Sequence, residues 1–151
     1  MKRLDHNILV VGIGNNSRQD DGLGWLFLDF LKDLKTSIDI EYKYQLQIED
    51  AELISKYDKV IFVDATKEKT QDGYYLKPCL PSEKYGFSSH ALAPETILYL
   101  CHKLYENHPE TSILAIQGYE WELKIGLSKK GSLNFNKAKK YFKDAVLINY
   151  I

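Results

Sequence analysis

The sequence predicts an α/β fold, specifically a three-layer α/β/α sandwich with a mostly parallel central sheet. Short apolar runs alternate along the chain with longer segments whose apolar residues recur at helical spacing, and this alternation is typical of such sheets. Two of the apolar runs, 8–11 and 60–63, contain no polar residue, as expected for strands covered on both faces. With 151 residues, of which 44% are hydrophobic, the chain has the size of one domain, and we expect residues 1–151 to form a single domain.

The first half of the chain is expected to contain three strands and two helices. The first and third strands are the apolar runs that end at Gly12 and Asp64, and the second strand shows alternating apolar residues. The long helix between the first two strands carries apolar residues every three or four positions. In chain order, the expected elements are a strand at 8–11, a helix at 23–34, a strand at 38–46, a short helix at 50–56 and a strand at 60–63.

The second half is expected to contain two more strands and two more helices. Residues 74–77 form a weak strand at the periphery, and residues 112–116 form the last apolar strand, which ends at Gln117 and Gly118. A helix that begins near His90 or Pro94 and a closing helix at 133–147 show apolar residues at helical spacing. The apolar face of the first of these helices is formed by Leu92, Ile97, Leu100, Cys101 and Leu104.

Charge and hydropathy argue against several classes of function. The chain has 20 Lys and Arg residues and 21 Asp and Glu residues, whereas a nucleic-acid-binding domain normally has a basic surface. No stretch approaches the ~18 apolar residues that a membrane span needs. The apolar run 8–11 is also too short for a signal peptide. We therefore expect a cytoplasmic protein with no nucleic-acid or membrane partner; the sequence does not give its oligomeric state, for which a monomer is the simplest expectation.

The two cysteines, Cys79 and Cys101, are too few for a four-cysteine zinc site and too far apart for a CxxC redox pair. Free thiols in a reducing compartment are the simplest interpretation. Cys101 falls on the apolar face of a predicted helix and Cys79 lies in a loop, so we expect both to be structural.

The segment after the first strand contains the glycines of a nucleotide-binding loop but departs from that motif. Gly12 and Gly14 fit the dinucleotide fingerprint, whereas Ser17 stands where its third glycine should be. Asp20 and Asp21 would then lie where a pyrophosphate meets the helix, and two carboxylates there would repel phosphates. No Gly-Lys-Ser/Thr follows, so the phosphate loop of the NTPases is excluded as well.

In parallel α/β sheets ligands bind at the carboxyl ends of the strands, and this rule selects the candidate site residues. Asp20 and Asp21 follow the first strand, Asp64 ends the third, and His90 opens a helix. For the aspartate pair, helix capping competes with a functional role, and we expect one to cap and the other to face the crevice. Asp64 could also be a turn former and His90 a capping or surface residue. Together, two carboxylates and one neutral imidazole would make a divalent transition-metal site with open positions.

Three segments of the sequence resemble the hydrogenase maturation endopeptidases, which trim the C-terminal extension from the large subunit of nickel–iron hydrogenases. The segments are Gly-Ile-Gly-Asn-Asn-Ser-Arg-Gln-Asp-Asp-Gly-Leu-Gly at 12–24, Val-Ile-Phe-Val-Asp-Ala at 60–65 and Ser-Ser-His at 88–90. Their order and spacing extend over most of the chain. The first segment is fairly specific, and the other two gain their meaning from it.

The resemblance implies that Asp21, Asp64 and His90 bind a metal and are the catalytic residues. The position of Asp21 is often glutamate in this family, so the side chain here is one methylene shorter. The resemblance also implies that nickel arrives on the substrate, which is the hydrogenase large-subunit precursor, that no organic cofactor takes part, and that no covalent nucleophile is established. Metal-assisted hydrolysis could then use Asp20 as a base, although capping by Asp20 is the competing interpretation.

Two other functions stay open at this point. The chain could be a small-molecule or nucleotide-binding α/β module without protease activity, or another α/β hydrolase that uses His90 and Asp64 with water. For a protease, the residues after the last strand are candidates for contact with the folded substrate. Tyr119 and Trp121 could form an interface or cover the core, and Glu120 and Glu122 could bind a basic residue near the cleavage site.

Overall fold

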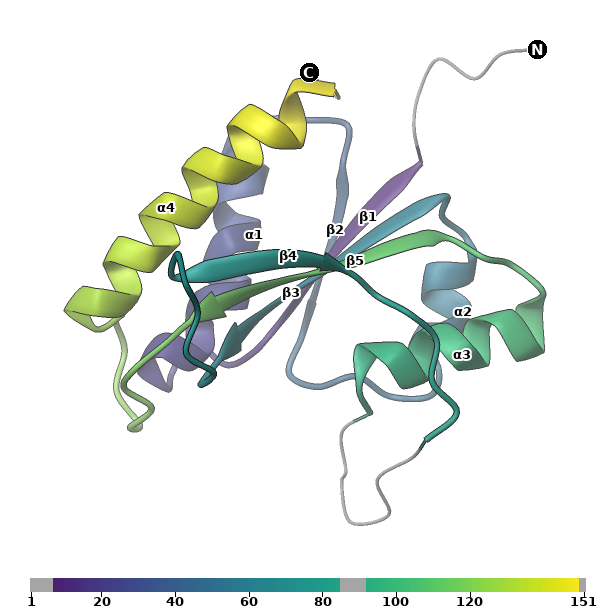
Figure 1. Ribbon diagram of the computed structural model, residues 1–151, viewed down its shortest axis with the longest axis horizontal. Helices are drawn as coiled ribbons and strands as arrows, with labels where there is room; N and C mark the ends of the chain where they lie inside the picture. Colours follow the sequence, from purple (N-terminus) through teal and green to yellow (C-terminus); the bar gives the residue numbers. More distant parts are fainter. Residues whose placement is uncertain (1–6, 85–91, 150–151) are drawn as a thin grey trace.

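The computed structural model describes residues 7–84 and 92–149, and it shows a five-stranded sheet between two layers of helices (Figure 1). The strands are β1 (Ile8–Ile13), β2 (Asp39–Lys43), β3 (Lys59–Thr66), β4 (Tyr74–Pro78) and β5 (Glu110–Gln117). The helices are α1 (Leu23–Asp33), α2 (Asp50–Ser55), α3 (Pro94–Tyr105) and α4 (Lys129–Ala145), with 3-10 turns η1 (Gln19–Gly22) and η2 (Leu147–Asn149). The predicted α/β fold class is confirmed.

The sheet has the strand order β2-β1-β3-β5-β4. Neighbouring strands are parallel except at one edge, where β4 runs antiparallel to β5. The weak strand expected at 74–77 therefore lies at the periphery, as predicted. β1 pairs with β2 on one side and with β3 on the other, so the chain leaves these central strands in opposite directions and a crevice opens at their carboxyl ends.

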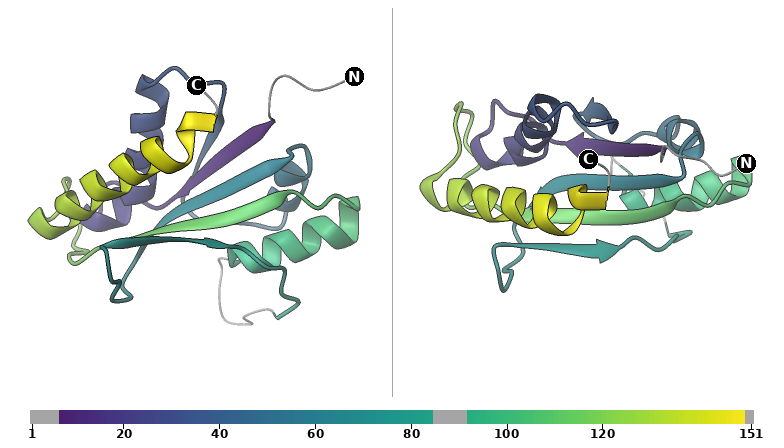
Figure 2. Two further views of the ribbon diagram at one scale, coloured as in Figure 1. Left: turned by 45° about the horizontal axis from the view of Figure 1, so that its top comes forward. Right: turned by 90° about the horizontal axis from the view of Figure 1, so that it is seen from above.

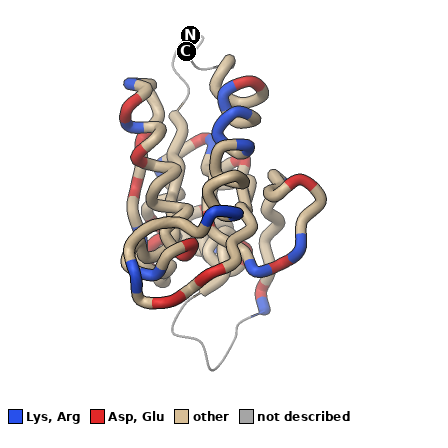
Figure 3. The backbone as a smooth tube through the Cα atoms, turned by 90° about the vertical axis from the view of Figure 1, so that its left-hand side faces the viewer, with Lys and Arg blue, Asp and Glu red and all other residues tan. Residues whose placement is uncertain are grey.

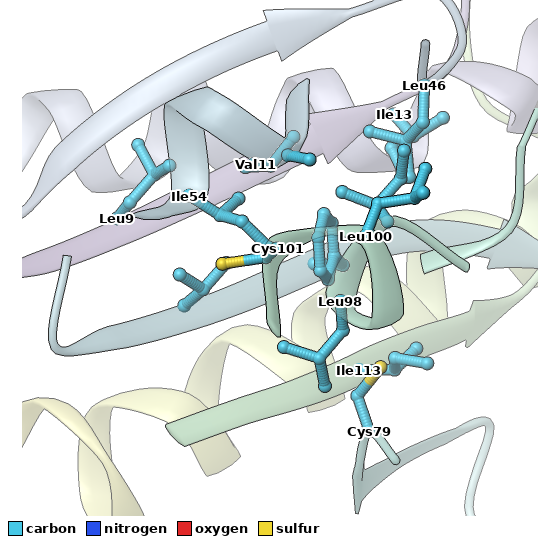
Figure 4. Close-up of a cluster of buried hydrophobic side chains, with 14 residues drawn as sticks. Leu9, Val11, Ile13, Leu46, Ile54, Cys79, Leu98, Leu100, Cys101 and Ile113 are labelled. Atoms are coloured by element: carbon cyan, nitrogen blue, oxygen red, sulfur yellow. The ribbon is translucent and has the colours of Figure 1, made fainter. Parts of the chain in front are cut away.

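Alternate residues of the central strands form two separate cores. Val10, Ile61 and Val63 pack with α1 and α4 on one face of the sheet. Leu9 and Phe62 point to the other face and pack with α2 and α3. Figure 2 shows the two helical layers on opposite sides of the sheet, and Figure 4 shows the second core around the end of α3. The continuous apolar runs in the sequence result from this burial on both faces.

Several elements differ from the sequence prediction in where they begin or end. The strand expected at 38–46 ends at Lys43, because its partner β1 ends at Ile13, which pairs with Lys43, and the Gly14 amide makes the last bond between the two strands, to the Lys43 carbonyl (2.9 Å). Beyond that point no strand pairing holds the alternation, and Tyr44 is 70% exposed while Leu46 is buried. Leu92, which was expected on the helix, lies before α3, because Pro94 occupies its first turn.

The closing helix begins at Lys129, four residues before the predicted start. Ser128 caps α4, and its hydroxyl accepts a hydrogen bond from the Gly131 amide (2.9 Å). The first turn contains no apolar residue to reveal the helical period, which is why the pattern became visible only at Leu133.

Among the described residues no helix is long and apolar enough to cross a membrane. Lys and Arg are interspersed with Asp and Glu over the side of the molecule at which β3 and β5 end (Figure 3). This mixture agrees with the near-zero net charge of the sequence.

Candidate active site

The loop between β1 and α1 is closed by its own hydrogen bonds. The Asn15 amide donates to the Asp21 carbonyl (3.0 Å), and the Arg18 amide donates to the Asn15 carbonyl (3.1 Å). The Asn15 side chain in turn accepts from the amide and the hydroxyl of Ser17. These backbone donors are therefore used within the protein, so the loop holds its two aspartates in place and offers few free amides to a phosphate.

The glycines of this segment let α1 approach the sheet closely. A Cβ atom on Gly24 would lie 2.4 Å from the Ile13 carbonyl oxygen and 2.7 Å from the Val63 carbonyl oxygen. Gly12 faces Gly24 across the same contact, where its own Cβ would lie 2.6 Å from the Gly24 oxygen. The glycine pattern that suggested a nucleotide loop thus has a packing role, because it brings the start of α1 against the ends of β1 and β3.

Asp20 is fully buried and its carboxylate is saturated with donors. One oxygen, Oδ2, accepts from the amides of Tyr119 (2.7 Å) and Glu120 (3.1 Å) and from the Ser128 hydroxyl (2.6 Å). The other, Oδ1, accepts from the Ser128 amide (2.8 Å). Burial alone would raise the pKa of Asp20, but these bonds outweigh it and lower the pKa below its ordinary value.

This geometry corrects both roles that the sequence suggested for Asp20. Neither η1 nor α1 has a side-chain cap, so Asp20 does not cap the helix that it precedes. It instead ties η1 to the segment between β5 and α4, about a hundred residues away. With all of these bonds made inside the protein and no exposure to solvent, Asp20 is not placed to act as a base.

Asp21 and Asp64 come together at the crevice, as predicted. Both line a cavity of about 440 Å³ whose other walls include Tyr44, Leu46 and Pro94. Both also line a second cavity of about 460 Å³, with Trp121 in its wall. The two carboxylates therefore form the boundary between two open spaces at the carboxyl ends of β1 and β3.

The environment of these carboxylates disfavours two negative charges. Burial raises the pKa of Asp64 to about 7, the Ala65 amide (2.8 Å) opposes this shift, and the charge of Asp21 adds to it. Burial also raises the pKa of Asp21, while the nearby cations of Arg18 and Lys67 lower it. A carboxylate pair with a raised pKa in a crevice is a feature of functional sites, and a bound cation would relieve its repulsion.

His90 lies outside the described residues, so the predicted third ligand has no described position. The chain re-enters the described part at Leu92, which lines the first cavity together with Ala93 and Pro94. Within residues 7–84 and 92–149, no group of three or more His, Cys, Asp or Glu residues could hold a metal ion. The described metal-ligating candidates are thus the two carboxylates.

The residues after β5 have different roles from one another. Trp121 lines the second cavity, and Tyr119 is 39% exposed with its hydroxyl bonded to Asn134 (3.0 Å). Glu120 and Glu122 are exposed and do not line either of the two cavities. The sequence analysis missed Arg18 and Lys67 in the second cavity because cations in loops carry no periodic signal.

Both cysteines are free and buried in the same hydrophobic cluster (Figure 4). Burial raises the pKa of Cys79 to about 12 and that of Cys101 to about 11, so neither thiol is activated as a nucleophile. The structural role expected for them is confirmed.

Comparison with solved structures shows what this arrangement is similar to. The hydrogenase maturating endopeptidase HybD from E. coli superposes with a TM-score of 0.74 at 18% identity, covering 95% of this chain and 93% of that one. The chain has the fold of the hydrogenase maturation proteases. The maturation protease HycI from Thermococcus kodakarensis gives a TM-score of 0.71 at 20% identity, with 93% and 92% covered.

A third structure supports the same fold. The hydrogenase 2 maturation peptidase from a Thaumarchaeota archaeon has a TM-score of 0.67 at 18% identity and covers 93% of this chain and 97% of its own. No protein-family model and no curated relative matches the sequence. The resemblance first drawn from three short segments therefore extends to the fold of nearly the whole chain.

Proposed function

We propose that this protein is an endopeptidase that removes the C-terminal extension from the nickel-loaded large-subunit precursor of a nickel–iron hydrogenase. The observation that carries the proposal is the pairing of Asp21 and Asp64 at the crevice between β1 and β3, in a fold shared with hydrogenase maturation proteases. Both aspartates belong to the segments that resemble that family. The buried thiols with raised pKa values agree with hydrolysis that forms no covalent intermediate.

The donor set suits a divalent metal carried by the substrate. Asp21 and Asp64 supply carboxylate oxygens, and His90 would add an imidazole nitrogen, a combination that leaves positions open for ligands from the substrate. A nickel ion held there would polarise the scissile carbonyl or lower the pKa of a bound water. Because Asp64 and Asp21 repel one another, binding of a cation between them would relieve this repulsion and would therefore be favoured.

The chain's own residues prepare the site for this substrate. The bonds that bury Asp20 fix the backbone of η1, and Asp21 is the next residue along it. The two cavities on either side of the carboxylates leave room for polypeptide to enter and leave. Recognition of nickel would restrict cleavage to precursors in which the metal is already loaded.

The test is processing of a nickel-loaded large-subunit precursor by wild-type protein and by Asp21→Ala, Asp64→Ala and His90→Ala. Each substitution should abolish cleavage while circular dichroism shows an intact fold, and Asp33→Ala, a change at an exposed aspartate, should cleave normally. Normal cleavage by all three site variants would refute the proposal. Equal cleavage of a precursor without nickel would instead favour a hydrolase that uses Asp64 and His90 with water.

Metal binding separates the peptidase from a small-molecule-binding module. Crystals soaked with cadmium, a surrogate for nickel, should show the ion on Asp21 and Asp64. Binding of a nucleotide at Gly12 and Gly14, with no ion on the carboxylates, would support the binding module.

A further inference from the structure

We propose that the second cavity is a carboxylate-binding subsite, in which Arg18 and Lys67 hold a carboxylate of the substrate polypeptide beside the scissile bond. The inference rests on the proposed peptidase function and deepens it. The cavity has a volume of about 460 Å³ and is lined by Arg18, Lys67 and Trp121 together with the two aspartates. Arg18 and Lys67 are both exposed, so a ligand can reach their cationic groups.

The two cavities that share the aspartates differ in charge. Apart from Asp21 and Asp64, the described residues that line the first cavity are uncharged, such as Tyr44, Leu46 and Leu92. The second cavity is lined by the same two aspartates and also by two cationic residues, Arg18 and Lys67. A polypeptide that crosses the carboxylates therefore meets two cations on the side of the second cavity and none among the described residues of the first, and this asymmetry would fix the direction in which the polypeptide lies.

Hydrogen bonds join the backbone segments that carry Arg18 and Trp121. The Gln19 amide donates to the Lys124 carbonyl (2.8 Å), and the Glu122 amide donates to the buried side chain of Gln19 (3.2 Å). These bonds fasten the segment that carries Arg18 to the segment that carries Trp121. A subsite whose walls are ordered before binding loses less entropy when a ligand enters.

Lys67 is positioned from a third segment. It follows β3, and its ammonium nitrogen lies 5.2 Å from the centre of the Trp121 ring. The indole thus provides a flat apolar surface beside the cation. A peptide carboxylate that enters would find two positive groups and this surface within one cavity.

Neutralisation of the two aspartates is the competing role for these cations. In the free protein Arg18 and Lys67 interact with the negative charge of Asp21 and lower its pKa. Once the aspartates hold a metal ion, their charge is taken up by that ion and the two cations are left to pair with another anion. The subsite should therefore bind a carboxylate more tightly when the aspartates are neutral, which Asp21→Asn/Asp64→Asn imitates without any metal.

The experiment titrates three acetylated tripeptides into this double variant and into wild-type protein, with detection by NMR. The probes are glycyl-alanyl-glycine amide, which has no carboxylate, glycyl-alanyl-glycine with a free C-terminal carboxylate, and glycyl-aspartyl-glycine amide with a side-chain carboxylate. The indole N–H signal of Trp121, identified from its loss in Trp121→Phe, reports binding at the cavity. Comparison of the two acids shows whether the subsite prefers a chain end or an acidic side chain.

We expect at least one acid to bind the double variant about tenfold more tightly than the amide, with a preference that weakens as salt is added. Adding Arg18→Gln and Lys67→Gln should remove the preference. The matched control adds Lys56→Gln and Lys103→Gln, which change the net charge equally at exposed lysines that do not line this cavity, and it should keep the preference. Equal binding of acids and amide, or a preference that survives loss of Arg18 and Lys67, would overturn the proposal.

These outcomes are separate from those of the proposed function, because binding is measured without nickel and without cleavage. If the protein prefers acids but cleaves no precursor, the proposed peptidase function is wrong and the carboxylate-binding subsite is supported. For an active peptidase, Arg18→Gln/Lys67→Gln should raise KM for the nickel-loaded precursor more than it changes kcat. If this double variant cleaves the precursor with an unchanged KM, the subsite is refuted and the peptidase function is supported.

Discussion

Replacement of Asp20 by asparagine should destabilise the fold strongly, although the side chain keeps its size. The carboxylate accepts bonds on both oxygens, from the amides of Tyr119 and Glu120 and the hydroxyl of Ser128 at Oδ2, and from the Ser128 amide at Oδ1. Asparagine replaces one acceptor by an NH2 group. In either orientation at least one buried backbone N–H then faces another donor.

The magnitude follows from these contacts. A buried N–H without an acceptor costs ~1–3 kcal/mol, and the remaining bonds lose the added strength that a charged acceptor gives. We therefore expect Asp20→Asn to lower the free energy of unfolding by ~4 kcal/mol, a large part of the ~5–15 kcal/mol that a domain possesses. Ser128→Ala removes one of the bonds and the cap of α4 and should cost ~1–2 kcal/mol.

Urea denaturation at several pH values measures both the loss and its cause. The folded pKa of Asp20 is lowered, because hydrogen bonds from Ser128, Tyr119 and Glu120 outweigh the opposing effect of burial. Its stabilisation is thus complete at neutral pH and disappears as the pH falls below 3.8 through the folded pKa. The difference between wild type and Asp20→Asn should shrink over that range. A loss below ~1 kcal/mol at pH 7, or a difference that stays constant with pH, would refute this reasoning.

Three further predictions follow from the described contacts. Burial raises the pKa of Asp64 in the folded protein to about 7, so the carboxyl ionises more readily in the unfolded chain and the free energy of unfolding falls as the pH rises from about 4 to about 7. Asp64→Asn keeps the acceptor for Ala65 and should stabilise chelator-treated protein by ~2 kcal/mol at pH 8, with little effect at pH 4, as measured by urea denaturation. Gly24→Ala places a Cβ against two strand carbonyls and should cost ~3 kcal/mol, seen as a lower Tm. Cys79 and Cys101 should resist a thiol reagent in the native protein and react in urea, whereas rapid native labelling would contradict their burial.

The sequence was sufficient to predict the sheet and its layers, because strands that are buried on both faces consist largely of consecutive apolar residues. Strands β1 and β3 contain the continuous apolar runs 8–11 and 60–63, and the carboxyl ends of such strands are where the site was expected. Asp21 and Asp64 were found by this rule together with the resemblance of their segments. The end of β2 could not be predicted, because it depends on where its partner β1 ends, at Ile13.

The roles within the aspartate pair could not be predicted for a similar reason. Sequence spacing places Asp20 and Asp21 at a helix start, where either could cap. The deciding contacts come from Tyr119, Glu120 and Ser128, about a hundred residues later, and nothing local indicates them. The second cavity also collects its lining from three distant segments.

The different surroundings of the two aspartates predict that Asp21 tolerates a longer side chain and that Asp20 does not. Asp20 is enclosed so tightly that a Cβ on Gly118 or Gly131 would lie within 2.7 Å of it, and the extra methylene of glutamate would have to enter that filled space. Asp21 borders two open cavities, where one more methylene only extends its reach. Neighbouring residues of a 3-10 turn point about 120° apart, so a buried carboxylate and one that lines a cavity can be adjacent in sequence. The bonds that Asp20 makes to the segment after β5 and the exposure of Asp21 to the two cavities are thus two consequences of one short turn.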